Sequence, residues 1–222
     1  MAGHVLDHPI WAALTGPHAH LAQVSGRARR YPRDISPFCA FEVSTEDAHR
    51  DVAALLAPGE VAPVFPPWPE APDTGWQLVC QMVCLKPDRL TLVPPGLVTL
   101  GAADVPDMLA LVEAARRGPF GPQTISVGRY IGVRDGGRLM GMAGERLHPP
   151  GHVEVSAVCT HPEYRGRGLA GALTAEVARG ILARNLTPFL HVFCTCSRTT
   201  WVHAGSTRPW ASRYAASLRC RW

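Results

Sequence analysis

The clearest hydrophobic pattern in the chain is a short alternating segment that leads, through glycines, into a helical repeat. Between residues 153 and 157, apolar side chains alternate with Glu and Ser, which is the period of a half-buried strand. Pro162 ends this strand, because proline has no N–H to donate to a neighbouring strand. From Leu169 to about residue 184, apolar residues return every three or four positions, as they do on one face of a helix. The pattern predicts a strand, a glycine turn and a helix, in that order.

The segments around this unit predict a regular succession of further strands and helices. Asp135-Gly136-Gly137 is a strong turn signal between two apolar segments and therefore predicts a hairpin. Pro94-Pro95-Gly96 interrupts the pattern and is the best predicted domain boundary. After that boundary the predicted elements are a strand over 97–100, a helix capped by Asp104 and closed at Gly118-Pro119, hairpin strands over 129–134 and 138–147, the strand–turn–helix unit, and a strand over 187–193.

The first 93 residues carry a weaker pattern. It predicts a short helix over 9–14, a helix that begins after Thr45, and strands over 60–65 and 75–85. We therefore expect residues 1–93 to form a small α/β lobe of unclear role, and residues 94–222 to form the main domain. A local basic run is favoured as a solvated turn over a binding patch; it comprises Arg27, Arg29, Arg30 and Arg33.

Composition excludes several classes of protein. The net charge of +4 is mild, and nucleic-acid binding usually needs a clustered basic face. No apolar run approaches the roughly 18 residues of a membrane span, and residues 1–10 do not resemble a signal peptide, so a cytoplasmic location is expected. The 7 cysteines are odd in number and form no repeated CxxC pair, which predicts free thiols and no metal site.

The glycine turn carries the candidate chemistry. Gly166 and Gly168 let successive backbone N–H groups point into one concavity, at the positively polarised start of a helix and beside two arginines. Such a site suits a pyrophosphate. The run Arg165-Gly166-Arg167-Gly168-Leu169-Ala170 fits the Arg/Gln-x-x-Gly-x-Gly/Ala pattern of the GNAT acyl-CoA N-acyltransferases, and the preceding Glu-Val-Ser-x-Val-Cys-Thr-His-Pro resembles their FR47-like branch.

This resemblance, which covers roughly residues 97–193, implies a fold and a set of binding residues. The fold would be α/β, a mixed sheet with flanking helices, preceded here by the smaller lobe. Acetyl-CoA would be the acyl donor, an amine the acceptor, and the loop at Phe120 would face the acceptor. The pantetheine arm and the thioester carbonyl would contact backbone groups of Val158, Cys159 and Thr160. The pyrophosphate would bind to Arg165, Gly166, Arg167, Gly168, Leu169 and Ala170.

The general base is left open between two carboxylates. Glu154 lies on the motif strand and is the first candidate; Glu145, on the neighbouring strand, is the second. For each of them an ion-paired or surface role is equally favoured. Cys159 is expected to be a small buried residue rather than a nucleophile, because no Cys-His-Asn order is visible.

The resemblance stops after Phe193. The family normally continues with an Asn-containing turn, a helix bearing Leu-Tyr and a Gly-Phe strand, whereas residues 194–222 hold 5 Arg, 3 Trp and no acidic residue. We hypothesise a change of reading frame, with a basic aromatic tail that binds nucleic acid as the alternative. Without the missing helix and strand, the edge at 187–193 is expected to lack a partner, leaving the chain poorly soluble.

The function implied by the resemblance is acyl transfer from acetyl-CoA to an unidentified amine. A non-catalytic acyl-CoA-binding module is the first alternative, because the segment that would supply the acid is missing. A nucleic-acid binder that uses the tail is the second. The sequence predicts neither the acceptor nor the oligomeric state.

Overall fold

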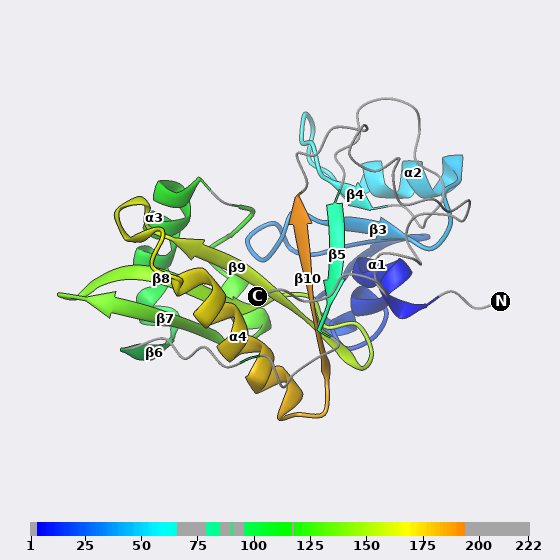
Figure 1. The fold of residues 1–222 in the computed structure, drawn as a ribbon. Helices are drawn as coiled ribbons and strands as arrows, with labels where there is room; N and C mark the ends of the chain where they lie inside the picture. Colours follow the sequence, from blue (N-terminus) through cyan, green and yellow to red (C-terminus); the bar gives the residue numbers. More distant parts are fainter. Residues whose placement is uncertain (1–3, 66–78, 85–89, 91–95, 117, 194–222) are drawn as a thin grey trace, which may run out of the picture.

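Two β-sheets organise the part of the chain that the computed structural model describes, which comprises residues 4–65, 79–84, 90, 96–116 and 118–193 (Figure 1). The small sheet comes from the N-terminal segment, and the large sheet takes the later strands. The tail 194–222 lies outside the described residues, and so do the reading-frame and nucleic-acid hypotheses attached to it. None of the helices in the described ranges is long and apolar enough to cross a membrane.

The small sheet has the strand order β1-β2-β3-β4, with α2 packed against it through Ala48 and Val52. Helix α2 begins as predicted, since the Thr45 hydroxyl accepts a hydrogen bond from the Ala48 N–H at 3.1 Å. The elements of this segment are η1 (Val5–Asp7), α1 (Pro9–Leu14), η2 (Ala19–Leu21), β1 (Gln23–Ser25), β2 (Ala28–Arg30), β3 (Cys39–Phe41), α2 (Glu46–Ala54) and β4 (Val64–Phe65).

Several predictions for the N-terminal segment were wrong. Strands β1, β2 and β3 were missed, because three residues are too few to show an alternating pattern. The predicted strand over 60–65 shrinks to its last two residues. Arg30 is not part of a solvated turn: it is 3% exposed and forms a salt bridge of 2.8 Å with Glu60.

The large sheet has the strand order β5-β10-β9-β8-β7-β6. Tyr130 and Ile131 are neighbours on β7, so their side chains point to opposite faces. Tyr130 packs in one core cluster with Met108 of α3, and Ile131 in another with Leu173 of α4, so the two helices cover opposite faces of the sheet. The elements are β5 (Val79–Val83), β6 (Leu97–Leu100), η4 (Ala102–Asp104), α3 (Val105–Ala115), η5 (Thr124–Val127), β7 (Tyr130–Asp135), β8 (Arg138–Glu145), β9 (His152–Thr160), η6 (Pro162–Tyr164), α4 (Leu169–Leu182) and β10 (Thr187–Phe193).

The mixed sheet with flanking helices confirms the predicted fold class, and the order of elements from 97 to 193 is the predicted one. Helix α3 begins directly after Asp104, as predicted, but its capping and its end differ from the prediction. The Asp104 side chain does not cap α3; its carboxylate accepts a hydrogen bond from the Gly101 N–H and pairs with Arg134. Helix α3 ends at Ala115, before the predicted Gly118-Pro119, because Arg116 adopts a left-handed backbone conformation with φ of 52°.

The edge at 187–193 does have a partner, so the prediction of an unpaired edge was wrong. Strand β5 pairs with β10 antiparallel, in a register that runs from Phe189↔Val83 to Phe193↔Val79. In Figure 1, β5 and β10 lie side by side between the small sheet and the rest of the large one. Because β5 precedes the predicted boundary at residue 94, a division of the chain at that point would cut the large sheet.

Candidate active site

Strands β9 and β10 start as parallel neighbours and then separate. Their register pairs run from His152↔Thr187 to Val155↔Leu190 and stop there. Beyond Val155, β9 continues along β8 as far as Thr160, while β10 continues along β5. The sheet therefore opens between the second half of β9 and the second half of β10.

A β-bulge lies on β9 where the two strands separate. The β8–β9 register passes from Met142↔Cys159 to Gly144↔Ser156, so two residues of β9, Ala157 and Val158, face one residue of β8. Ala157 has a φ of 51°, which is uncommon for a residue other than glycine. A bulge leaves backbone groups of the extra residue outside the ladder. Unpaired N–H and C=O groups are thus offered to a ligand at the place where the sheet opens.

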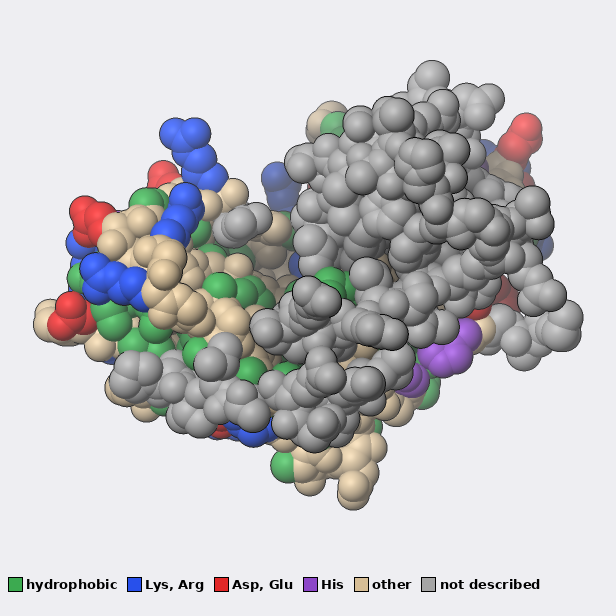
Figure 2. All heavy atoms as spheres, in the orientation of Figure 1, with side chains coloured by type: hydrophobic (Ala, Val, Ile, Leu, Met, Phe, Trp, Pro, Cys, Tyr) green, Lys and Arg blue, Asp and Glu red, His purple; other side chains and the backbone are tan. Residues whose placement is uncertain are grey.

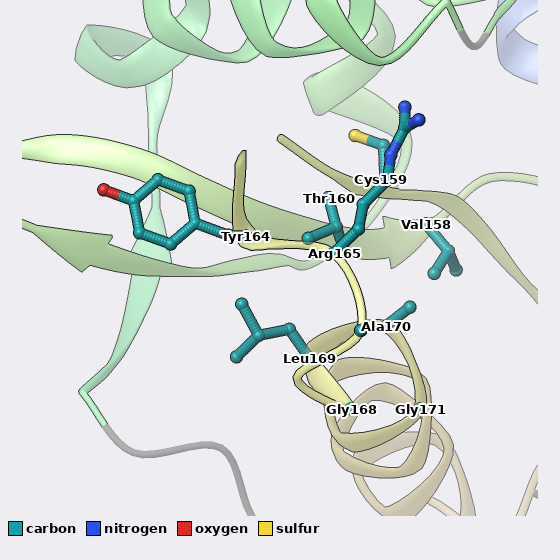
Figure 3. A pocket seen from close by; sticks show the side chains of 10 residues that line it. Val158, Cys159, Thr160, Tyr164, Arg165, Gly168, Leu169, Ala170 and Gly171 are labelled. Carbon is teal, nitrogen blue, oxygen red and sulfur yellow. The ribbon is translucent and has the colours of Figure 1, made fainter. Parts of the chain in front are cut away.

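The glycine turn forms a hollow of about 210 Å³ between the end of β9 and the start of α4 (Figure 3). In this view the side chains of Val158 and Ala170 point into the space between strand and helix, and the ring of Tyr164 points away from it. We call this space the glycine-turn hollow. Its lining residues are Val158, Cys159, Thr160, Tyr164, Arg165, Gly166, Gly168, Leu169, Ala170 and Gly171.

The electrostatics of the glycine-turn hollow suit an anion. Gly168 is the N-cap of α4 with a φ of 74°, and no side chain caps the helix there. The first N–H groups of α4 are therefore left to a ligand, at the positive end of a 14-residue helix. The exposed Arg165 adds a guanidinium, whose Nη2 donates to the Ala115 carbonyl oxygen at the end of α3, at 3.3 Å.

Eight of the nine residues predicted to bind acetyl-CoA line the glycine-turn hollow, and neither of the two predicted carboxylates does. Arg167 does not line the hollow: its guanidinium lies over the ring of Tyr164, 5.0 Å from the centroid. Figure 2 shows basic side chains gathered at the end of the molecule that carries α3 and the glycine turn, with acidic ones beside them. Arg165 is therefore the arginine of the motif that the structure brings to the hollow.

A second cavity, of about 380 Å³, occupies the opening between β9 and β10; we call it the splay cavity. It shares four lining residues with the glycine-turn hollow, so the two spaces form one continuous groove; these are Val158, Cys159, Ala170 and Gly171. The far wall comes from the end of α3 and the following loop; it comprises Val112, Gly118, Pro119 and Phe120. The polar residues that line the splay cavity are Arg146, Ser156, Thr174 and His191.

Glu154, the first predicted base, is buried in an ion-pair network and does not line the splay cavity. Arg146 donates two hydrogen bonds of 2.8 Å, one to each carboxylate oxygen, and His191 Nδ1 lies 2.7 Å from Oε1. Burial alone would raise the pKa of this carboxyl, but the charge and hydrogen bonds of Arg146, with the His191 hydrogen bond, lower it to about 2. Such a carboxylate is a weak base whose lone pairs are already used.

Glu145, the second predicted base, does not line the splay cavity either. It is 1% exposed, and Arg184 donates to its Oε1 at 2.6 Å. Its Oε2 lies 3.7 Å from Nε2 of His148. Alternation along β8 places Glu145 on the same side as Ala143, which packs against α4. The carboxylate therefore belongs to an ion-paired cluster away from the opening of the sheet.

Cys159 is 3% exposed, in agreement with the prediction of a small buried residue. Neither Arg146 nor His191 was predicted from the sequence to be a site residue, although both line the splay cavity. Arg146 faces Glu154 across the β8–β9 turn, and a basic residue opposite an acidic one in a predicted hairpin would have been a usable signal. His191 could not be placed, because its position beside Glu154 depends on the parallel pairing of β9 with β10.

Comparisons with known proteins agree with this geometry. The family model described as FR47-like protein matches residues 130–200. A solved Novosphingobium aromaticivorans protein, assigned to the GNAT family as an acetyltransferase, is 39% identical, covers 89% of this chain and 90% of its own, and superposes with a TM-score of 0.74. No curated protein matches the chain.

Two more distant structures have only the fold in common with this chain. A GCN5-related N-acetyltransferase-like protein of Streptococcus suis is 15% identical, with 83% of this chain and 82% of its own covered and a TM-score of 0.54. A conserved protein of unknown function from Staphylococcus epidermidis is 12% identical, with 86% of this chain and 91% of its own covered and a TM-score of 0.53.

Proposed function

The chain belongs to the GNAT family of acetyltransferases, and from that premise we propose that it transfers an acyl group from acyl-CoA, in the first instance acetyl-CoA, to the nitrogen of an amine. The single observation that carries this proposal is the continuous groove. It leads from the start of α4, which no side chain caps, to the opening in the sheet beside the β9 bulge. A ligand with a charged diphosphate at one end and a reactive thioester at the other fits such a groove. A cytoplasmic location is part of the same proposal.

The glycine-turn hollow would hold the pyrophosphate of CoA. Backbone N–H groups at Gly168, Leu169 and Ala170 would donate to the phosphate oxygens, and the Arg165 guanidinium would add charge-assisted hydrogen bonds. Gly166 and Gly168, with φ of 78° and 74°, adopt the left-handed conformation that this turn requires. Arg167 would act on the phosphates from the rim, through long-range charge.

The β9 bulge would hold the thioester. Attack by an amine turns the carbonyl oxygen into an oxyanion, which needs a hydrogen-bond donor already aimed at it. The unpaired backbone groups around Ala157 and Val158 lie in the wall of the splay cavity and would supply that donor. The acceptor would then enter from the side of Phe120 and Val112, on the other side of the splay cavity.

Calorimetry with acetyl-CoA and with desulfo-CoA, together with mass spectrometry of products from a panel of primary amines, tests this proposal. We expect micromolar binding of acetyl-CoA and one or more amines that gain an acetyl group. A folded protein that binds neither ligand would refute the proposal.

A non-catalytic acyl-CoA-binding module is the second candidate. The observation in its favour is that neither Glu154 nor Glu145 lines the splay cavity. In the reaction proposed first, Glu154 therefore acts through the residues it binds, and Glu145 has a structural role. Tight binding of acetyl-CoA with no acetylated amine, and no release of free CoA above the uncatalysed rate, would favour the binding module.

A further inference from the structure

We propose that His191 is the general base of the acyl transfer and that Glu154 and Gln81 hold its ring in the one tautomer that can accept a proton. This inference rests on the proposed function, because it supplies the proton acceptor that the two predicted carboxylates do not. His191 lies on β10 at the edge of the splay cavity, beyond the last β9–β10 register pair.

The partner of Nδ1 fixes the proton on that nitrogen. His191 Nδ1 lies 2.7 Å from Oε1 of Glu154. Arg146 binds both oxygens of Glu154 and holds the pKa of this carboxyl at about 2, so it stays ionised and can only accept a hydrogen bond. Nδ1 must therefore carry a hydrogen and donate it.

The partner of Nε2 leaves a lone pair on the other nitrogen. The side-chain nitrogen of Gln81 donates to the Leu6 carbonyl oxygen at 3.0 Å, and that oxygen can only accept. This contact fixes the amide orientation, so the same NH₂ group faces His191 Nε2 at 3.1 Å as a donor. Nε2 is therefore an unprotonated acceptor, and the ring is the neutral tautomer with hydrogen on Nδ1.

This arrangement matches the needs of a base in acyl transfer. The acceptor ammonium takes the place of the Gln81 amide beside His191 Nε2. It then gives one proton to Nε2, which leaves a lone pair on the amine nitrogen. That pair forms the C–N bond to the thioester carbon, the C–S bond breaks with its electrons on sulfur, and the remaining excess proton of the nitrogen passes to the thiolate. Glu154 stabilises the imidazolium across the 2.7 Å contact.

The charged groups around His191 favour this role without competing for the proton. Glu154, on β9, and Arg146, just after β8, form a bidentate ion pair whose net charge is zero. Gln81 of β5 is uncharged, and the Phe189 ring lies 5.4 Å from the His191 ring on the same strand. Burial raises the pKa values of Tyr31 and Tyr130, which interact with Glu154 and Arg146, so both stay neutral.

The test compares His191→Gln with a matched control, His152→Gln. His152 lies at the start of β9, outside the splay cavity, with its Nδ1 2.9 Å from the Pro150 carbonyl oxygen. With an amine found by the product screen, we expect His191→Gln to lower kcat/KM by about 10²-fold or more and to abolish the rise of the pH–rate profile. Acetyl-CoA affinity and melting temperature should stay close to those of the control. A purely structural role would lower the melting temperature and keep the shape of the pH profile.

Nitrogen-15 NMR of the histidine rings gives a readout that needs no acceptor. In the native protein we expect the His191 ring to be protonated at Nδ1 and unprotonated at Nε2. In Gln81→Glu, a carboxylate beside Nε2 should hold a proton there and suppress turnover. A native ring protonated at Nε2, or a His191→Gln protein with unchanged rate and pH profile, would overturn the inference even if acetyl-CoA binds. Failure of the native protein to bind acetyl-CoA would instead refute the proposed function, and this inference with it.

Discussion

Val83 of β5 is the register partner of Phe189 of β10, and both side chains are buried in the same core cluster. The N-terminal segment thus closes the large sheet beside the strand that borders the candidate active site. The same segment places Phe38 under the Arg146 guanidinium, 4.8 Å from the ring centroid, and Leu6 against Gln81. Residues before the predicted boundary are therefore part of the structure that shapes the site.

The β5–β10 contact predicts a stability effect for Val83→Ala. The substitution removes two buried methyl groups and leaves a cavity, so we expect a loss of about 1.5–2.5 kcal/mol in the free energy of unfolding. Val24→Ala on β1 is the control, because Val24 is 57% exposed. Urea unfolding followed by circular dichroism measures both. A loss at Val83 no larger than at Val24 would mean that β5 is not held in the core.

The glycine turn predicts a charge effect at Gly168. Gly168→Asp puts a carboxylate beside the proposed pyrophosphate, and at about 5 Å with an effective dielectric of about 20 the repulsion is on the order of 3 kcal/mol, or about 100-fold in Kd for CoA. Gly168→Asn has the same shape without the charge, and asparagine tolerates a φ of 74° better than most residues. A Cβ at this position meets no atom within 4 Å. Calorimetry with CoA should separate the two variants; equal affinities would argue against a phosphate at this turn.

The Arg146–Glu154 pair predicts strong non-additivity. Glu154→Gln leaves the buried Arg146 charge uncompensated, so we expect it to destabilise the fold by about 3–5 kcal/mol. Arg146→Met together with Glu154→Gln removes both charges and should cost much less than the two single changes added. Unfolding curves of the two single variants and the double variant measure the coupling. Additive effects would show that the pair is not a unit.

The His18 ring predicts a loss of stability in mild acid. Burial, followed by the neighbouring His148 and His20, lowers the pKa of His18 from 6.5 to about 4 in the folded protein. The unfolded chain therefore binds a proton at a higher pH than the folded one. Stability is complete above pH 6.5 and falls as the pH drops towards 4, by up to about 3 kcal/mol.

Melting curves between pH 7.5 and 4.5 test this effect, with His18→Gln as the variant and His152→Gln as the control. His18 Nδ1 lies 2.9 Å from the Tyr31 hydroxyl, and its ring lies 4.8 Å from that of His148. The slope of stability against pH should be smaller in His18→Gln and unchanged in His152→Gln. The same slope in all three proteins would assign the effect to another group.

The sequence predicted the part of the fold that depends on local patterns. The β7–β8 hairpin, β9, the glycine turn and α4 each lie within a short stretch whose period or turn residues are visible. The residues predicted to bind the cofactor come from the same stretch, and all of them except Arg167 line the glycine-turn hollow. The environment of Glu154 could not be predicted in this way, because its two partners come from a turn after β8 and from β10. Their approach depends on sheet pairing, which no single stretch records.

The pairing of β5 with β10 also sets an order of events during synthesis. β5 leaves the ribosome about 100 residues before its partner, which at 5–20 residues per second is a delay of roughly 5–20 s. During that time the strand cannot complete the large sheet, because its register partner β10 has not yet been made. Completion of the sheet must wait for the last strand and closes a long loop, which is a slow, entropically unfavourable step. A chain interrupted before residue 187 would therefore expose β5 to other chains and to proteases.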